Sequence, residues 1–591
     1  MNNKLHRLGI IWLSLIVSLV LYQYYVVLAS PQVPYMDTML YIVQIDQILK
    51  GEVSWLDVYG SGEHRGLIYP FVTFIEWAFW GVDARISTRL TGFVLVATFF
   101  YWLSAFLSVR PGVAIENKKV AIVVCLVAAV IVVSPAGFEL WTLDLGFAQI
   151  LKNFLIVTFL YLLAVKRSWA KTSISAITFG ICGGFLILFA TYGWSYPFFI
   201  ASSFALIISA IGAPGTRKQA LIVIVVMLLA QALYVYNGQG VFSTNKPGAA
   251  DGVSLLGLIS GILYGAGTVF IGSETMQRFS LPVAVPLMLG VLVLVAAFLA
   301  LLIALVERTR EKIFLSGLLM FSLTVLAGVA VARGFPDFTN TGASRYFVDY
   351  VWLLLAPLAI VFTAQESILA RNIPHKLLNA ISLKKLVAIT RIFVMALLLA
   401  AMSGHLATWY VELQTAPFRA TLFKGMAEVY RNGVASESDA ALLQSPFSVA
   451  RRAIAVAQSY NLSVLRNDPG QCTLTTAGYR GDWYPAEEND MRWLKKQGTI
   501  SFDQCLTDVI IKGFIPESFS ARNLLVTYGE INQSIAIVPG EEFLFVVNVG
   551  DKETVMIGLQ LEATTTPASA GINADTRELG LLLTYIGKSN F

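Results

Sequence analysis

The stretch PVAVPLMLGVLVLVAAFLALLIALV, residues 282–306, decides the fold class, because it contains no charged side chain. A helix needs about 20 mostly apolar residues to cross the hydrocarbon core of a bilayer. A helix that is apolar on every side is stable only inside a bilayer or in the core of a large protein. We therefore predict that this segment spans a membrane.

The same pattern recurs along the first 410 residues. The chain has 591 residues, of which 56% are hydrophobic and 13% charged, with a mean hydropathy of +0.69. Soluble domains carry about 25% charged residues, so this composition excludes a cytosolic enzyme and a disordered chain. The net charge of +5 gives no basic footprint for nucleic acid. We expect eleven spans, at 8–29, 90–109, 119–134, 146–165, 173–191, 196–212, 219–236, 282–306, 313–331, 345–364 and 388–410.

The distribution of charge between the loops predicts the orientation. Residues 66–81 are apolar but short and contain Pro70 and Glu76. If they lie flat on the outer surface, the inner loops hold seventeen Lys and Arg against four acids, and the outer loops hold eight against twelve. This agrees with the positive-inside rule. We predict an inside N-terminus formed by an uncleaved anchor, an outside C-terminus, and a flat or half-inserted apolar segment at 252–272.

The chain after the last span has a different texture. We divide the chain into a membrane domain at 1–410, an outer helical linker at 411–469 and an outer β-sandwich at 470–591. Apolar β-type runs separated by turn signals predict its strands at 524–528, 534–538, 543–549, 554–561 and 579–586. Cys472 and Cys505 both lie in this tail and are a possible disulfide in an oxidising compartment.

Ionisable side chains gather near the predicted outer membrane face, where they are costly to keep. Asp37 follows the first span and precedes an amphipathic helix expected at 39–50, which Gly51 is placed to end. One interpretation is that Asp37 caps this helix. The other is that its carboxylate acts as a base at the membrane surface. The two are compatible, because a capped carboxylate stays ionised.

Two more groups lie in the outer loops. Glu63, His64 and Arg65 precede the flat segment, and the planar guanidinium of Arg65 suits phosphate oxygens. The alternative for these three is a solvated turn. Glu139 and Asp144 lie in the loop at 135–145.

Two basic side chains lie close to or inside the spans. Lys152, about two turns into the fourth span, either extends to the membrane surface or faces a polar cavity. Arg345 opens a span, with Asp349 one turn deeper. Arg345 either pairs with Asp349 along the helix or binds a phosphate group.

These residues resemble those of a known superfamily. The early Asp37, the run Glu63-His64-Arg65, and Ser344-Arg345-Tyr346 at a span entrance are similar to motifs of the GT-C superfamily. Its members are integral membrane glycosyltransferases that use polyprenyl-phosphate sugars, and the likeness covers roughly residues 1–466. A stretch expected to contain Trp-Gly-Phe-Gln reads Leu145-Gly146-Phe147-Ala148-Gln149 here, so that match is partial. The tail, which ends in Asp575-Thr576-Arg577-Glu578-Leu579-Gly580, is similar to jelly-roll domains of surface-glycan enzymes.

The resemblance implies an inverting glycosyltransferase of the bacterial cytoplasmic (inner) membrane, with a periplasmic C-terminal domain. Asp37 would be the catalytic base. Arg345, Arg65 and Lys152 would bind the donor phosphate, and Glu63, His64, Glu139 and Asp144 would orient the substrates. The partners implied are a polyprenyl-phosphate sugar, a glycan or lipid-linked acceptor of the lipopolysaccharide O-antigen type, and membrane lipid. The scheme needs no cofactor and no metal ligand, although a divalent metal stays open.

Two other functions fit the same features. A transporter or flippase for a lipid-linked glycan also has many spans, but we find no internal repeat or matched broken helices. A polymerase or ligase of lipid-linked polysaccharide shares the donor chemistry, and the early Asp37 favours the transferase over it.

Overall fold

The computed structural model describes residues 2–60, 66–108, 118–236, 254–333, 337–365, 383–467, 477–487, 491–503, 509–529, 531–547, 554–570 and 575–588. The chain divides into two compact units. The first unit, called the membrane unit below, comprises Met1–Pro31, Val53–Val72 and Arg85–Ala420. The second comprises Gln32–Glu52, Thr73–Ala84 and Thr421–Phe591 and is called the outer unit below, after the side of the membrane predicted for it from the sequence.

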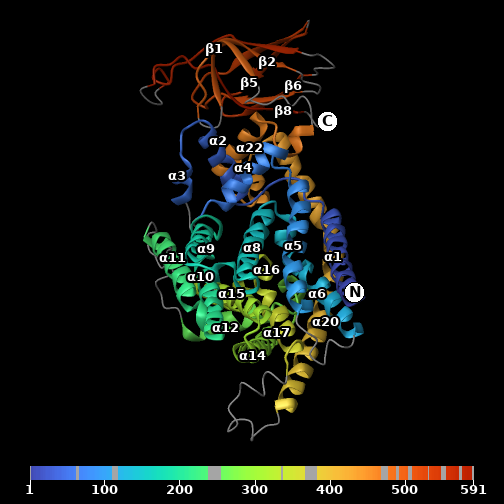
Figure 1. Cartoon of the computed structure of the whole chain (residues 1–591). Helices are drawn as coiled ribbons and strands as arrows, with labels where there is room; N and C mark the ends of the chain where they lie inside the picture. The colour runs from blue at the N-terminus through green and yellow to red at the C-terminus, as the bar shows by residue number, and fades with distance from the viewer. Residues whose placement is uncertain are drawn as a thin grey trace. The chain divides into compact units, whose positions relative to one another are not determined.

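Within the described residues, eleven helical segments are long and apolar enough to cross a membrane, and each overlaps a predicted span. The prediction of a polytopic helical chain is therefore confirmed. The segment predicted to lie flat contains α4 (Ile68–Trp80), and the one at 252–272 contains α12 (Leu255–Gly267); each has 13 residues, too few to span. The long segments are built from α1 (Asn2–Ala29), α5 (Ala84–Ser108), α6 (Lys118–Val132) with α7 (Phe138–Thr142), α8 (Gly146–Tyr161), α9 (Ser173–Phe185), α10 (Ser195–Gly212), α11 (Arg217–Tyr236), α14 (Ala284–Glu307), α15 (Arg310–Arg333), α16 (Phe347–Tyr350) with α17 (Trp352–Phe362), and α20 (Leu383–Asn432) (Figure 1).

The helices of the membrane unit differ in how deeply they are buried. The segment of α16 and α17 is the most buried, and α15 packs against it and against α10. In contrast, α14 exposes large apolar side chains such as Met288 and Phe298, as expected for a helix that faces lipid. Small residues permit the closest packing: Gly180 and Gly183 of α9 lie against α11, where a Cβ atom would collide with Val226 and Met227.

The last long helix extends beyond the expected span. α20 has 50 residues, which is about 75 Å of helix and far more than a bilayer core requires. The predicted domain boundary at residue 410 lies inside this helix. Pro417 is also inside it and removes one backbone hydrogen bond.

The helices of the outer unit form a small layer of their own. α2 (Thr38–Leu49) packs against α22 (Phe447–Ser459), which follows α21 (Glu437–Leu442). α2 coincides with the amphipathic helix predicted at 39–50, and Gly51, at φ +74°, follows its C-cap. Met39, Ile42 and Ile45 on its apolar face are fully buried.

The β domain of the outer unit forms one hydrogen-bonded sheet. Along the sheet the strand order is β5-β4-β7-β2-β8-β3-β6, and β1 pairs with β2. The bounds are β1 (Gly478–Trp483), β2 (Arg492–Asp503), β3 (Val509–Phe514), β4 (Arg522–Tyr528), β5 (Ile531–Ile537), β6 (Glu542–Val547), β7 (Thr554–Leu561) and β8 (Leu581–Lys588) (Figure 1).

The two edge strands show that this sheet is strongly curled. Ile537 ends β5 and Glu542 begins β6, and residues 538–541 between them span at most about 18 Å. In a flat sheet these edges would stand about 29 Å apart, six strand spacings of about 4.8 Å. The sheet therefore curls over a single core to which all seven strands of the path contribute. The two layers of the predicted sandwich are continuous through the long strand β2, which pairs with both β7 and β8.

Each of the five predicted strands overlaps a strand of this sheet. The regular alternation of buried and half-buried positions along β4 is the pattern that made these segments recognisable. β1, β2 and β3 were not predicted. β2 contains Arg492, Lys495 and Lys496, so its apolar signal is weak in the sequence.

Candidate functional site

Asp37 stands at the N-cap position of α2, but its side chain does not cap the helix. Its backbone is helical (φ −63°, ψ −20°), and its carboxylate makes no capping hydrogen bond. The expectation that the carboxylate caps α2 is therefore wrong, because a capping side chain requires an extended backbone at that position. The carboxylate is exposed, and none of the described residues is hydrogen-bonded to it.

The backbone around Asp37 is held firmly within the outer unit. Met36 adopts a left-handed conformation at φ +57°, and its N–H donates to the Leu443 carbonyl at 2.9 Å. The buried hydroxyl of Tyr430 donates to the Pro34 carbonyl at 3.0 Å. An exposed acid is thus presented on a rigid backbone, which suits a group that must reach a substrate.

Glu139 and Arg345, which are far apart in the sequence, pair in the membrane unit. Arg345 Nε lies 3.4 Å from Glu139 Oε1, and Ser344 Oγ donates to Glu139 Oε2 at 3.0 Å. The side chain of Arg345 is 50% exposed, and neither Nη atom bonds to another described residue. The i,i+4 pair of Arg345 with Asp349 does not form. Glu139 holds the Nε side of the guanidinium and leaves its two outer nitrogens available.

Asp349 instead belongs to a buried cluster around α8. Its two carboxylate oxygens accept hydrogen bonds from Gln149 Nε2 at 3.1 Å and Asn153 Nδ2 at 2.8 Å. Lys152 Nζ donates to Gln149 Oε1 at 2.9 Å. Only 1% of Lys152 is exposed, so its side chain does not extend to the membrane surface. The amides of one helix face thus satisfy an acid and a base inside the bundle.

Aromatic side chains connect the buried cluster to Arg345. Lys152 Nζ lies 4.8 Å from the centre of the Trp194 ring, and Trp194 contacts the ring of Tyr346 at 6.4 Å between centroids. Tyr346 follows Arg345 directly in the chain. The hydroxyl of Tyr69 on α4 donates to Gln149. Two aromatic rings therefore link Lys152 to the exposed guanidinium.

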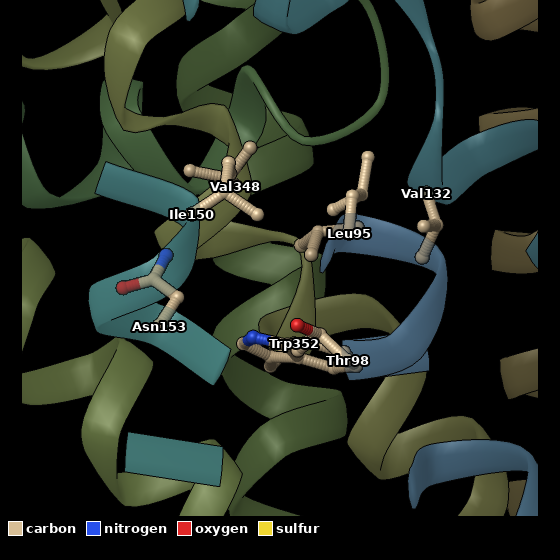
Figure 2. Close-up of a pocket in the computed structure, with 8 residues that line it drawn as sticks. Leu95, Thr98, Val132, Ile150, Asn153, Val348 and Trp352 are labelled. Atoms are coloured by element: carbon tan, nitrogen blue, oxygen red, sulfur yellow. The ribbon is translucent and has the colours of Figure 1, made fainter. Parts of the chain in front are cut away.

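A cavity adjoins Asn153 of α8. Figure 2 shows the side chains of Asn153, Thr98 and Trp352 at its polar edge. Apolar side chains make up the rest of its wall, so it does not suit a sugar or a phosphate. Its lining residues are Leu95, Thr98, Val132, Ile150, Asn153, Val348, Val351 and Trp352.

The other predicted site residues are placed as follows. Asp144 is fully buried, next to the start of α8. Glu63, His64, Arg65, Cys472 and Cys505 lie outside the described residues, so the predicted phosphate contact and the predicted disulfide stay predictions. Asp37 belongs to the outer unit, and Glu139, Asp144, Lys152 and Arg345 belong to the membrane unit.

The sequence interpretation missed some partners. Ser344 was noted only as part of a motif, and Tyr69 and Gln149 were not expected to join Lys152. The sequence contained one signal for this cluster, namely a base in one predicted span, Lys152, and an acid in another, Asp349. Buried charges inside a bilayer normally pair, so these two residues were candidates for a shared cluster. Among the described residues, no three His, Cys, Asp or Glu side chains are grouped closely enough to hold a metal ion.

No protein-family model and no curated protein sequence match this chain. Among solved structures, it is similar to an oligosaccharyltransferase from Archaeoglobus fulgidus in the apo form, with 14% sequence identity and a TM-score of 0.36. The match covers 75% of this chain and 60% of that one, so it reaches less than two thirds of the archaeal chain. A likeness of this size establishes neither a shared fold nor a shared activity.

The fold and the candidate site together define a polytopic helical membrane protein with a C-terminal β domain. Its described residues include eleven helical segments of membrane length and, toward the C-terminal end of the chain, a curled antiparallel β-sheet domain. The membrane unit carries a half-exposed arginine next to a buried cluster of charges, and the outer unit presents an exposed aspartate.

Proposed function

We propose that the protein is an inverting glycosyltransferase that transfers a sugar from a polyprenyl-phosphate donor to a cell-surface glycan. The reaction takes place at the outer face of a bacterial cytoplasmic membrane. The observation that carries the proposal is the Arg345 guanidinium. Glu139 holds it through Nε, it is half exposed, and its Nη nitrogens bind no other described residue. A planar cation held in this way suits two oxygens of a phosphate.

Asp37 is the proposed catalytic base. As the acceptor hydroxyl attacks the anomeric carbon, Asp37 takes its proton, a new glycosidic C–O bond forms and the bond to the phosphate oxygen breaks. The exposed carboxylate, free of capping bonds, supports this role. The leaving group is the polyprenyl phosphate, whose growing negative charge Arg345 stabilises. Attack from the face opposite the leaving group inverts the anomeric configuration.

Lys152 contributes to the surroundings of Arg345 through its neighbours. Because it is buried beside Trp194, we assign it to the electrostatic environment of Arg345 and Tyr346 rather than to direct contact with solvent. Glu139 orients Arg345. Glu63, His64 and Arg65 keep their proposed roles around the substrates, and the β domain holds the acceptor glycan or caps the enzyme. Because Asp144 is fully buried, its proposed role in orienting substrates acts through neighbouring residues.

The test is sugar transfer by the full-length protein in nanodiscs, supplied with a panel of radiolabelled undecaprenyl-phosphate monosaccharides and cell-surface glycan. Asp37→Asn should lower the transfer rate by about 10²–10⁴-fold, the usual contribution of a general base. Arg345→Ala should lower it by about 10²–10³-fold. Asp57→Asn is the matched control, because Asp57 is another exposed aspartate at the start of a short helix.

The outcomes separate this function from its rivals. Full transfer by Asp37→Asn would remove Asp37 as the base. Movement of the lipid-linked sugar across the bilayer without a new glycosidic bond would identify a flippase. Joining of whole preassembled glycans, with no transfer of single sugars, would identify a polymerase or ligase.

A further inference from the structure

Three arginines gather at one end of the membrane unit, where the turn after α8 meets the turn between α14 and α15. Arg167 follows η2 (Leu162–Lys166), the helical turn that continues α8. Arg308 follows the last residue of α14, and Arg310 is the first residue of α15. Arg310 Nη1 donates to the Val165 carbonyl at 3.4 Å, so the two turns are in contact. We call the surface formed by these three arginines the arginine face.

The arginine face lies at the opposite end of the bundle from Arg345. Glu139, which pairs with Arg345, precedes α8, whereas Arg167 follows the end of that segment. The membrane-length segment between them, Gly146–Lys166, has 21 residues, or about 31 Å of helix. This is close to the thickness of the hydrocarbon core of a bilayer. The arginine face is therefore at the other membrane surface, which the loop charges predict to be the inner one.

Arg167 and Arg308 are held in the same way. Both have a left-handed backbone, at φ 50° and 49°, which is uncommon for residues other than glycine. Arg167 Nε donates to the Ala164 carbonyl at 3.2 Å, and Arg308 Nε donates to the Leu305 carbonyl at 2.6 Å. Each side chain thus satisfies a carbonyl in the last turn of its own helix. None of the described residues is hydrogen-bonded to the Nη nitrogens of these two arginines.

Arg310 has a position that its helix does not favour. As the first residue of α15 it stands at the positive end of the helix dipole, where a cation is destabilising. An anion is favoured at the same place, because the first backbone N–H groups of a helix have no partner within the helix. Capping of carbonyl groups explains Arg167 and Arg308, but it does not explain Arg310. Arg310 is therefore the residue that indicates an anionic ligand.

The acids close to the arginine face do not neutralise it. Glu307 is buried and pairs with Lys312, and it accepts a hydrogen bond from the Gln365 N–H at 2.8 Å. Glu311 of α15 is half-buried and acts electrostatically on Arg167, but its carboxylate makes no ion pair with any described arginine. One carboxylate thus faces three guanidiniums, and the surface keeps an excess of positive charge.

We propose that the arginine face binds the phosphodiester headgroup of an anionic phospholipid. The Nη nitrogens and the first N–H groups of α15 supply donors for the phosphate oxygens. The source is a lipid, because the face stands at the ends of membrane-length helices, where headgroups are concentrated. Leu162 and Leu302, within two turns of the arginines along η2 and α14, are exposed and suit contact with an acyl chain. The inference does not use Arg345 and is independent of the proposed function.

The first measurement is the thermal unfolding midpoint of the full-length protein in nanodiscs of phosphatidylcholine, with and without phosphatidylglycerol. A ligand of the folded state raises the midpoint, so phosphatidylglycerol should raise it in the wild type. Arg310→Gln should remove most of this rise without lowering the midpoint in phosphatidylcholine, because Arg310 opposes its own helix dipole. Arg7→Gln, at a half-buried arginine of α1 on the same predicted side, is the matched control and should keep the full rise. A purely structural role for Arg310 would lower the midpoint in both lipids.

The second measurement is the affinity of the detergent-solubilised protein for phosphatidylglycerol, with phosphatidylcholine of the same acyl chains and inorganic phosphate as references. A cation at a membrane surface contributes about fivefold to the binding of anionic lipid, so Arg308→Gln and Arg310→Gln should each weaken binding by about fivefold. Arg310→Lys keeps the charge and should recover part of the loss. The titration is repeated in Arg345→Ala, which lacks the other proposed phosphate contact, and the loss caused by Arg310→Gln should persist there.

Three results would overturn the inference. Equal affinity for phosphatidylglycerol and phosphatidylcholine would show that the face does not select an anionic headgroup. Displacement of the lipid by an equal concentration of inorganic phosphate would identify a site for free phosphate. Loss of the lipid preference in Arg345→Ala, but not in Arg310→Gln, would place the lipid at the opposite surface. Sugar transfer tests the proposed function separately and does not depend on any of these results.

Discussion

Each unit contains a group of acidic and basic side chains, and the two groups differ in how far they are exposed to solvent. In the membrane unit, Lys152 and Asp349 are at most 1% exposed. In the β domain, Arg577 is 42% exposed and pairs with Asp575 at 2.8 Å and with Glu487 at 3.1 Å. Removing one partner of a buried pair leaves a charge that water cannot reach, whereas exposed pairs are screened and contribute little. We therefore expect burial, and not the number of contacts, to determine how far a substitution lowers the free energy of unfolding.

The largest effect is expected at Asp349. Asp349→Ala removes the buried negative charge that acts on Lys152 and leaves the amides of Gln149 and Asn153 without their acceptor. We expect the free energy of unfolding to fall by about 3–5 kcal/mol, measured by denaturant titration of the detergent-solubilised protein. Lys152→Met added to Asp349→Ala should recover part of the loss, because it removes the uncompensated cation. A loss no greater than that at Arg577 would contradict the comparison.

An intermediate effect is expected at Arg522, which is buried although it lies in the β domain. Its guanidinium donates to the Ala563 carbonyl at 2.9 Å and to Thr565 Oγ1 at 2.9 Å, and Nε donates to the Ser520 carbonyl at 3.2 Å. Arg522→Ala should lower the free energy of unfolding by about 2–3 kcal/mol, the scale of a few hydrogen bonds to a charged donor. Thermal unfolding followed by near-ultraviolet circular dichroism measures this loss. Arg522→Lys keeps the positive charge but not the branched guanidinium, so its free energy of unfolding should lie between those of the wild type and of Arg522→Ala.

The smallest effect is expected at Arg577. Its side-chain and backbone hydrogen bonds lower the pKa of Asp575, so the stabilisation is present above about pH 4 and is lost as the pH falls below it. Because the pair is exposed, Arg577→Ala should shift the unfolding midpoint least of the three substitutions at neutral pH. Unfolding scans between about pH 3 and about pH 6 should show a slightly weaker acid dependence in the variant. A large loss at neutral pH would show that exposure does not set the cost.

Much of the fold could be predicted because it depends on patterns that are local in the sequence. The eleven membrane-length segments found among the described residues follow from runs of apolar residues, and α2 and β4 follow from periods of about 3.6 and 2 residues. β2 was not predicted, because its charged residues weaken the apolar signal in the sequence. In the structure, its pairing with β7 and β8 holds it in the sheet. The extent of α20 was not predicted either, since apolar character ends near residue 410 but the helix does not.

The candidate site was only partly predictable, because its contacts join residues that are far apart in the chain. Arg345 was recognised as a residue that pairs or binds phosphate, but its partner is Glu139 and not the nearer Asp349. Asp37 was recognised as an acid at the start of a helix, but only its backbone conformation shows that the carboxylate is not used as a cap. The two-pronged ion pair of Glu412 and Arg419 on α20 was missed, because the groups that contact it, Tyr25 and Phe138, come from distant parts of the chain.

The sequence by itself therefore determined that this is a chain of many apolar helices followed by a β domain, because hydrophobic period and run length are properties of neighbouring residues. It also determined which ionisable residues lie in or beside apolar segments, where a charge is costly to keep. Only the tertiary structure decided which acid meets which base, since a charge in an apolar bundle takes whichever partner the packing of distant helices brings within hydrogen-bonding distance.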